Sequence, residues 1–88
     1  MSVKDNEAKR LFADRQAAYN NALGGDGKAT KAVLEDLKKF CRAEETCFHH
    51  DPRVHAAKEG RREVWLRVQD HLTLSPDEFW DKYKGANP

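Results

Sequence analysis

The stretch from residue 30 to residue 43 constrains the fold most, because its apolar side chains recur at the spacing of a helix. Val33, Leu34, Leu37, Phe40 and Cys41 lie three or four residues apart, which gathers them on one face of an α-helix. Charged residues occupy the opposite face. No stretch of the chain shows the alternating pattern of a half-buried strand, so the sequence predicts an all-α fold.

Two predicted helices occupy the first half of the chain. The first covers residues 5–23, where a weaker apolar stripe recurs at three- and four-residue intervals. Three glycines then predict a flexible link over residues 24–29, because glycine is favoured at helix ends and costly inside helices. The second helix runs from Thr30, the predicted N-cap, to about Ala43.

Two further helices are predicted in the second half. Asp51 and Pro52 supply an N-cap followed by proline in the first turn, and the third helix then extends to about Leu72. Ser75 and Glu78 have the spacing of a capping box around Pro76, which predicts a short fourth helix over residues 76–84.

We expect a single small domain over residues 1–88 whose centre is an antiparallel hairpin of the helices at about 30–43 and 52–72. The predicted core residues are Leu34, Leu37, Phe40, Val64, Val68 and Leu72. Gly60 lies within the third helix, where it costs about 1 kcal/mol relative to alanine. Its position predicts either the close approach of another helix or a kink.

Length and charge limit the classes of function. The 88 residues include 16 Lys or Arg and 15 Asp or Glu, for a formal net charge of +1. Such a balance gives no overall attraction to nucleic acid or to an anionic membrane. No apolar run approaches the roughly 20 residues that span a bilayer, and the N-terminus has no hydrophobic segment typical of export. We therefore expect reduced cysteines in a cytoplasm, with a Cys41–Cys47 disulfide as the alternative in a particle exposed to air.

The segment from Cys41 to His55 holds the one set of side chains typical of a metal site. Cys41, Cys47, His49 and His55, with His50 beside them, supply the thiolate and imidazole donors that zinc prefers. Their spacing differs from that of zinc fingers, in which paired cysteines lie two to four residues apart. The alternative is structural: buried cysteines and polar loop histidines. The simpler alternative is favoured, so no cofactor is expected.

Catalysis has little support in the sequence. A cysteine–histidine pair is a potential nucleophile, but the chain has no glycine-rich phosphate loop, no nucleophile elbow and no zinc-protease motif. A domain of this size also has difficulty enclosing a pocket that excludes water. The sequence predicts a protein that is not an enzyme.

A basic cluster on the third helix indicates contact with a partner. It consists of Lys58, Arg61, Arg62 and Arg67. Five Lys or Arg against three Asp or Glu over residues 53–72 leave only +2, and pairs such as Arg61 with Glu63 predict a mixed surface. Nucleic-acid-binding helices usually have a less compensated basic face, so nucleic acid is not the expected partner.

Protein binding agrees better with the composition, because interfaces are enriched in tryptophan, tyrosine, phenylalanine and arginine. The predicted contact residues are Arg61, Arg62, Trp65, Arg67 and Trp80. Trp80 lies in the fourth helix with Phe79 and Tyr83. These three aromatic side chains either pack onto the hairpin or leave an anchor for a neighbouring protein.

Residues 32–74 resemble a family of small, mostly uncharacterised proteins of tailed bacteriophages. The resemblance rests on Val33-Leu34-Glu35-Asp36-Leu37, Phe40-Cys41, Glu45-Thr46, Phe48-His49, Asp51-Pro52-Arg53 and the string EGRREVWLR over residues 59–67. Members of that family are encoded among the virion structural genes of short-tailed phages and prophages. The resemblance implies a phage protein made in a bacterial cytoplasm, and it supplies no catalytic residue and no ligand.

We expect from the residues and the resemblance together a non-enzymatic protein that is found in the virion, or assists its assembly, by packing against portal, capsid or internal proteins. Self-association is a further expectation. Two alternatives stay open: a regulator that binds a protein of the bacterial host, and a zinc-stabilised module that binds nucleic acid.

Overall fold

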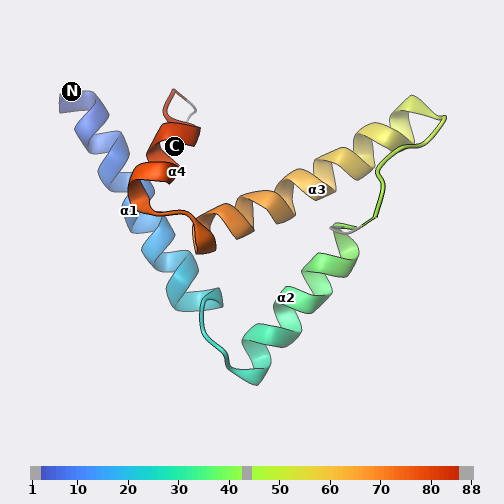
Figure 1. Ribbon diagram of the computed structural model, residues 1–88, viewed down its shortest axis with the longest axis horizontal. Coiled ribbons are helices and arrows are strands. Elements are labelled where there is room, and N and C mark those ends of the chain that lie inside the picture. Colours follow the sequence, from blue (N-terminus) through green and yellow to red (C-terminus); the bar gives the residue numbers. More distant parts are fainter. Residues whose placement is uncertain (1–2, 43–44, 86–88) are drawn as a thin grey trace. The chain divides into compact units, whose positions relative to one another are not determined.

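The computed structural model describes residues 3–42 and 45–85, and these residues form four helices without a strand (Figure 1). The helices are α1 (Val3–Leu23), α2 (Lys28–Phe40), α3 (Pro52–Thr73) and α4 (Pro76–Tyr83). The all-α prediction is thus confirmed. None of the described helices is both long enough and apolar enough to cross a membrane.

The chain divides into two compact units, residues 1–25 with 70–88 and residues 26–69. The first, here the terminal unit, contains α1, the last turn of α3 and α4. The second, here the central unit, contains α2 and the rest of α3, joined by the segment that holds both cysteines. The single domain expected from the length stays a prediction.

The predicted starts of α3 and α4 are confirmed by their hydrogen bonds. The backbone N–H of Arg53 donates to Oδ1 of Asp51 at 2.9 Å, which caps α3. At α4, the N–H of Glu78 donates to Oγ of Ser75 at 3.2 Å, and the N–H of Ser75 donates to Oε1 of Glu78 at 3.1 Å. These reciprocal bonds satisfy two N–H groups that a helix end otherwise leaves unpaired.

The predicted bounds of α2 need correction. Gly27 is its N-cap and makes no side-chain cap bond, so Thr30 lies inside the first turn. At the other end Cys41 is the C-cap, and Arg42 has a φ of 53°. This left-handed backbone turns the chain out of the helix, because a helix cannot continue through it. Ala43, the predicted last residue, lies outside the described residues.

The terminal unit has an aromatic core at which three helices meet. The rings of Phe12 and Phe79 pack edge to face with centroids 5.7 Å apart. His71 is fully buried, with its ring stacked on Tyr19 at 3.9 Å and 4.5 Å from the ring of Phe79. Packing of α4 on α1 thus takes place largely through rings, which contribute large apolar areas per residue.

Polar bonds from α1 fix the segment between α3 and α4. The side-chain amide of Gln16 donates to the carbonyl of Leu74 at 3.0 Å, and that of Asn20 donates to the carbonyl of His71 at 3.2 Å. These carbonyls lie at the C-terminal end of α3, where a helix leaves acceptors unpaired. Lys9 also forms an ion pair with Asp77 at 3.0 Å.

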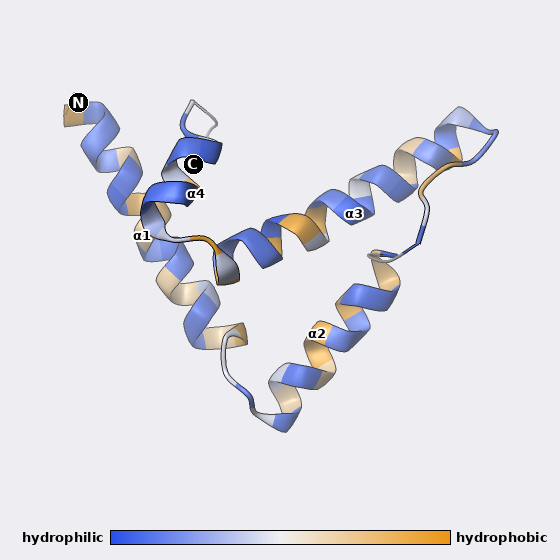
Figure 2. Cartoon of the chain, viewed as in Figure 1, coloured by the Kyte–Doolittle hydropathy of each residue, from blue (hydrophilic) through white to orange (hydrophobic). Residues whose placement is uncertain are grey.

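The core prediction is partly wrong. Val68 is buried, and Leu34, Leu37 and Leu72 are half-buried, but Phe40 is 61% exposed and Val64 is 55% exposed. Helix α2 has no buried residue although its apolar stripe is clear (Figure 2). A periodic apolar stripe predicts which face of a helix is favourable to bury. It does not show whether that face is buried by the same chain or by another protein.

The expectation that Gly60 marks a close helix contact is also wrong. A Cβ atom placed on Gly60 meets nothing within 4 Å, so no neighbouring backbone in the structure requires glycine there. Helix α3 continues through this position without interruption from Pro52 to Thr73.

Candidate functional site

The cysteines and histidines of the predicted metal site are separated into different environments. Cys41 and Cys47 are both buried free thiols. Nδ1 of His49 accepts a hydrogen bond from the backbone N–H of Asp51 at 3.0 Å, and the His49 ring stacks on His50 at 4.5 Å. One nitrogen of His49 is therefore already occupied in capping the loop before α3.

His55 faces an aromatic neighbour. Its ring lies edge-on to Phe48 with centroids 6.2 Å apart. Across the described residues, which include all five predicted ligands, no three histidine, cysteine, aspartate or glutamate side chains lie close enough together to hold a metal ion. The donor set that the sequence brings close along the chain is thus not brought together in space.

A shallow groove lies along the first half of α3 in the central unit. We call it the α3 groove; it has a volume of ≈ 510 Å³ and is lined by Asp51, Arg53, Val54, Ala57, Lys58 and Arg61. Its lining holds three cations and one carboxylate around two aliphatic side chains. Asp51 is the capping residue of α3, and its Oδ1 lies 3.7 Å from Nε of Arg53.

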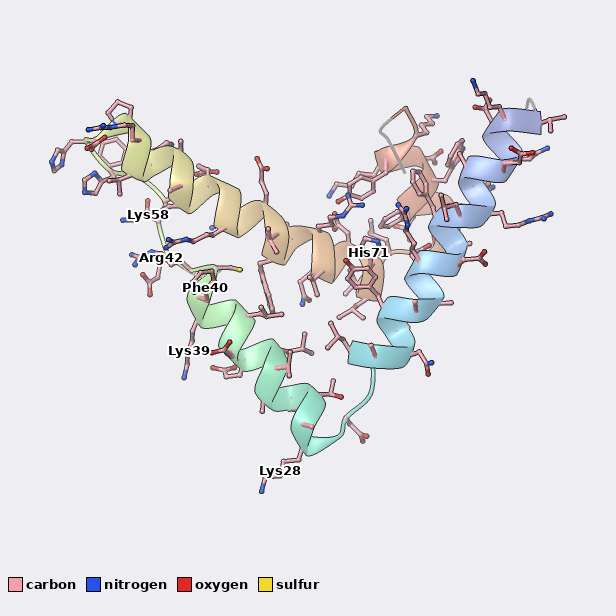
Figure 3. The ribbon with its side chains drawn as sticks, turned by 180° about the vertical axis from the view of Figure 1, so that it is seen from behind. Lys28, Lys39, Phe40, Arg42, Lys58 and His71 are labelled. Atoms are coloured by element: carbon pink, nitrogen blue, oxygen red, sulfur yellow. The ribbon has the colours of Figure 1, made fainter. Side chains whose placement is uncertain are left out.

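Arg61 connects the α3 groove to the end of α2. Its guanidinium lies over the ring of Phe40, 4.9 Å from the ring centroid. Such a contact between a cation and an aromatic face contributes about 0.5–1 kcal/mol at an exposed site. Lys58 lies on the same stretch of α3 (Figure 3), and neither Lys58 nor Arg61 pairs with a carboxylate of the described residues.

The other predicted contact residues lie in two places. Arg62 is half-buried, and its guanidinium donates to the carbonyl of Glu45 at 3.5 Å. Trp65 is half-buried and Arg67 is exposed, both farther along α3 in the central unit. Trp80 belongs to the terminal unit, where its ring lies 5.7 Å from that of Phe12. The structure therefore assigns Trp80 and the α3 residues to different units.

Trp80 borders a second groove, between α1 and α4. This groove has a volume of ≈ 520 Å³, and its apolar lining consists of Ala8, Leu11, Phe12 and Trp80. Lys4, Asp5, Glu7 and Gly85 complete it. Its charged residues nearly balance, so it has no marked preference for the charge of a ligand.

One carboxyl group of the terminal unit has a shifted pKa. Burial alone would raise the pKa of Asp70, but hydrogen bonds from Lys82 and Tyr83 and the charges of Lys82 and His71 outweigh it and lower the pKa. Oδ2 of Asp70 accepts from Nζ of Lys82 at 2.6 Å and from the hydroxyl of Tyr83 at 2.5 Å. The arrangement ties α3 to α4 and leaves Asp70 with a structural role.

Sequence reasoning missed several residues of the candidate surface. Phe40 was predicted to be core, although it is 61% exposed. Arg53 and Val54 received no role, although both line the α3 groove. The signal was present in the sequence: Arg53, Ala57 and Arg61 recur every four residues, which places them on one face of a helix.

A comparison with models of protein families gives a match over most of the chain. The model of a family described as Bbp19-like phage protein matches residues 8–82, a range that takes in all four helices in whole or in part. Neither the curated proteins nor the solved structures contain a significant match to the chain.

Proposed function

We propose that this chain, which belongs to the family of Bbp19-like phage proteins, packs against other proteins of the phage virion, either in the mature particle or during its assembly. The contact surface is the α3 groove with the exposed aromatic ring of Phe40 beside it. In this role the protein is not an enzyme: it is made in the bacterial cytoplasm and acts by occupying a surface of a portal, capsid or internal protein.

The observation that carries this proposal is the exposure of Phe40. Phe40 is the last residue of the amphipathic helix α2, and its side chain is 61% exposed. Helix α2 has no buried residue. Single exposed apolar residues are ordinary on protein surfaces, but Phe40 is one of several large apolar residues that the described part of the central unit exposes. The other exposed large apolar residues there are Val33, Phe48, Val54, Val64 and Leu66.

The position of Arg61 beside Phe40 supports a protein partner. Aromatic side chains, including phenylalanine, and arginine are enriched in the cores of protein interfaces. The Arg61–Phe40 contact holds one member of each class together at the surface. A partner that covers them excludes water from both, which strengthens the contact between cation and ring.

Quantitative mass spectrometry of purified particles tests the proposal. The particles come from the phage that encodes the chain, and the amount of this protein is measured relative to the capsid and portal proteins. We expect a fixed ratio across independent preparations. If the protein is abundant in infected cells but consistently absent from particles and from assembly intermediates, the proposal is wrong, and a regulator that binds a host protein becomes the better account.

A further inference from the structure

The α3 groove carries a net positive charge that its single carboxylate balances only in part. Arg53, Lys58 and Arg61 face one carboxylate, that of Asp51, and Arg53 is itself 94% exposed beside it. An exposed ion pair of this kind contributes little and leaves the charge accessible. The groove therefore attracts a negatively charged partner.

The carboxylates of α3 do not compensate this charge, because they lie on the other side of the helix. With 3.6 residues per turn, Glu59 and Glu63 point roughly opposite to Val54 and Arg61, and Glu59 lies about 100° around the helix from Lys58. The ion pair between Arg61 and Glu63 that the sequence suggests is not formed among the described residues. Charge on this part of α3 is thus unevenly distributed: Lys58 and Arg61 line the groove, whereas Glu59 and Glu63 do not.

The apolar part of the lining indicates which negatively charged partner fits. Val54 and Ala57 line the groove between the cations, and Val64 is exposed further along α3. A phosphate backbone gains little from aliphatic side chains, and the central unit has ten Lys or Arg against eight Asp or Glu, a net of +2. Nucleic-acid-binding domains usually carry a stronger and more continuous basic surface. A protein segment with both carboxylates and aliphatic side chains satisfies the whole lining.

The length of the groove sets the spacing of those carboxylates. Arg53 and Arg61 are eight residues apart on α3, which corresponds to about 12 Å along the helix axis at 1.5 Å per residue. A second helix that packs along α3 places side chains over this length when they recur every four residues. Amphipathic helices commonly bind grooves in this way, through anchors spaced by three and four residues.

We propose that the α3 groove binds an amphipathic acidic helix of a partner protein, with carboxylates repeated every four residues beside aliphatic side chains. The proposal rests on the proposed function, since it names the chemistry of the partner at the same surface. The carboxylates pair with Lys58 and Arg61, and the aliphatic side chains cover Val54 and Ala57. The nearby ring of Phe40, already under Arg61, borders this contact.

Fluorescence anisotropy with designed probes tests the pairing. The probes are a labelled 18-residue helical peptide of Leu, Ala and Glu with glutamate at every fourth position, a scrambled peptide of the same composition, and an 18-nucleotide oligo-dT. The protein is the full chain, either unchanged, as Lys58→Glu/Arg61→Glu, or as the control Lys28→Glu/Lys31→Glu. The control reverses two exposed charges at the N-terminal end of α2, and Figure 3 shows Lys28 at the end of α2 that is far from Lys58. Circular dichroism verifies that both variants remain helical.

We expect the unchanged chain and the control to bind the amphipathic acidic peptide, with affinity that falls as NaCl is raised. The groove variant binds it at least tenfold more weakly, and the unchanged chain binds the scrambled peptide and oligo-dT at least tenfold more weakly. Equal binding of scrambled peptide or DNA, an unaffected groove variant, or no binding up to about 1 mM peptide overturns the inference. A failure to bind the peptide does not contradict the proposed role in the virion, which the particle measurement tests separately. Absence of the protein from particles, together with peptide binding, contradicts only the virion role.

Discussion

The guanidinium of Arg61 lies 4.9 Å from the centroid of the Phe40 ring, so a cation on α3 covers the aromatic side chain that ends α2. The contact leaves most of the ring in solvent, since Phe40 is 61% exposed. It therefore joins two helices of the central unit without forming a core. A surface of this kind is suited to burial by a second protein. In the free chain, the contact between Arg61 and Phe40 contributes little to stability.

Replacing Phe40 by alanine should change stability only slightly. Loss of the exposed contact with Arg61 costs about 0.5–1 kcal/mol in the free energy of unfolding. The matched control is Phe79→Ala, which removes a fully buried ring and should cost about 3–5 kcal/mol or abolish folding. Urea denaturation followed by circular dichroism measures both. Equal losses in the two variants would show that Phe40 is buried in solution, contrary to our account of α2.

Replacing Gly60 by alanine should stabilise the protein by about 1 kcal/mol. The position is exposed and inside α3, a new Cβ meets nothing within 4 Å, and alanine has the higher helix propensity. Gly24→Ala is the opposite case, because its Cβ would lie 2.6 Å from the carbonyl oxygen of Asn20. Thermal unfolding should therefore show a higher midpoint for the first variant and a lower one for the second. A lower unfolding midpoint for Gly60→Ala would contradict this account and would indicate that another helix lies close to Gly60.

Removing the capping hydroxyl of Ser75 should cost about 1 kcal/mol. Ser75→Ala loses the bond from the N–H of Glu78, and α4 brings the buried ring of Phe79 to the terminal unit. Ser75→Asp retains an acceptor at the N-cap and should recover most of the loss. Denaturation curves of the two variants decide the matter, and equal destabilisation by alanine and aspartate would argue against a capping role.

Asp70 should make the terminal unit sensitive to acid. Its pKa in the folded protein is held below the ordinary value of 3.8. The stabilisation is therefore complete above the pKa of the unfolded chain and is lost as the pH falls through the lower pKa of the folded state. Asp70→Asn should flatten this loss in stability below about pH 4, as measured by unfolding midpoints between neutral pH and pH 2.

Asp77→Asn provides the comparison, because it removes an 85% exposed carboxylate paired with Lys9. This variant should retain the loss of stability in acid that Asp70→Asn reduces. If the acid dependence is the same in the unchanged chain and in Asp70→Asn, the bonds from Lys82 and Tyr83 do not stabilise the fold through the charge of Asp70.

The helices could be predicted from the sequence because their signals are local. Asp51, Ser75 and Glu78 cap helices through bonds to residues two or three positions away, and such pairs are visible in the chain itself. The start of α2 was missed because Gly27 caps it without a side chain. A pattern-based assignment favours Thr30, whose hydroxyl can accept a cap bond, over a glycine, which has no side chain to indicate the cap.

The core and the site were harder to predict because they depend on distant residues. The stripe containing Leu34 and Phe40 has the pattern of a core-facing helix, yet Phe40 is exposed. His71 shows the reverse, since a polar side chain is fully buried between Tyr19 and Phe79. Neither outcome follows from spacing alone. Arg61 is exposed on α3, and its contact with Phe40 depends on where the end of α2 lies in space, which residue spacing does not give.

The most direct test of the central claim is the incorporation of groove variants into phage particles. The phage is engineered to encode the unchanged chain, Lys58→Glu/Arg61→Glu or the control Lys28→Glu/Lys31→Glu, and each is quantified relative to the capsid protein in purified particles. The account predicts equal incorporation of the unchanged chain and the control, with at least a tenfold loss for the groove variant despite normal levels in the cell. Incorporation of the groove variant at the unchanged ratio would contradict it.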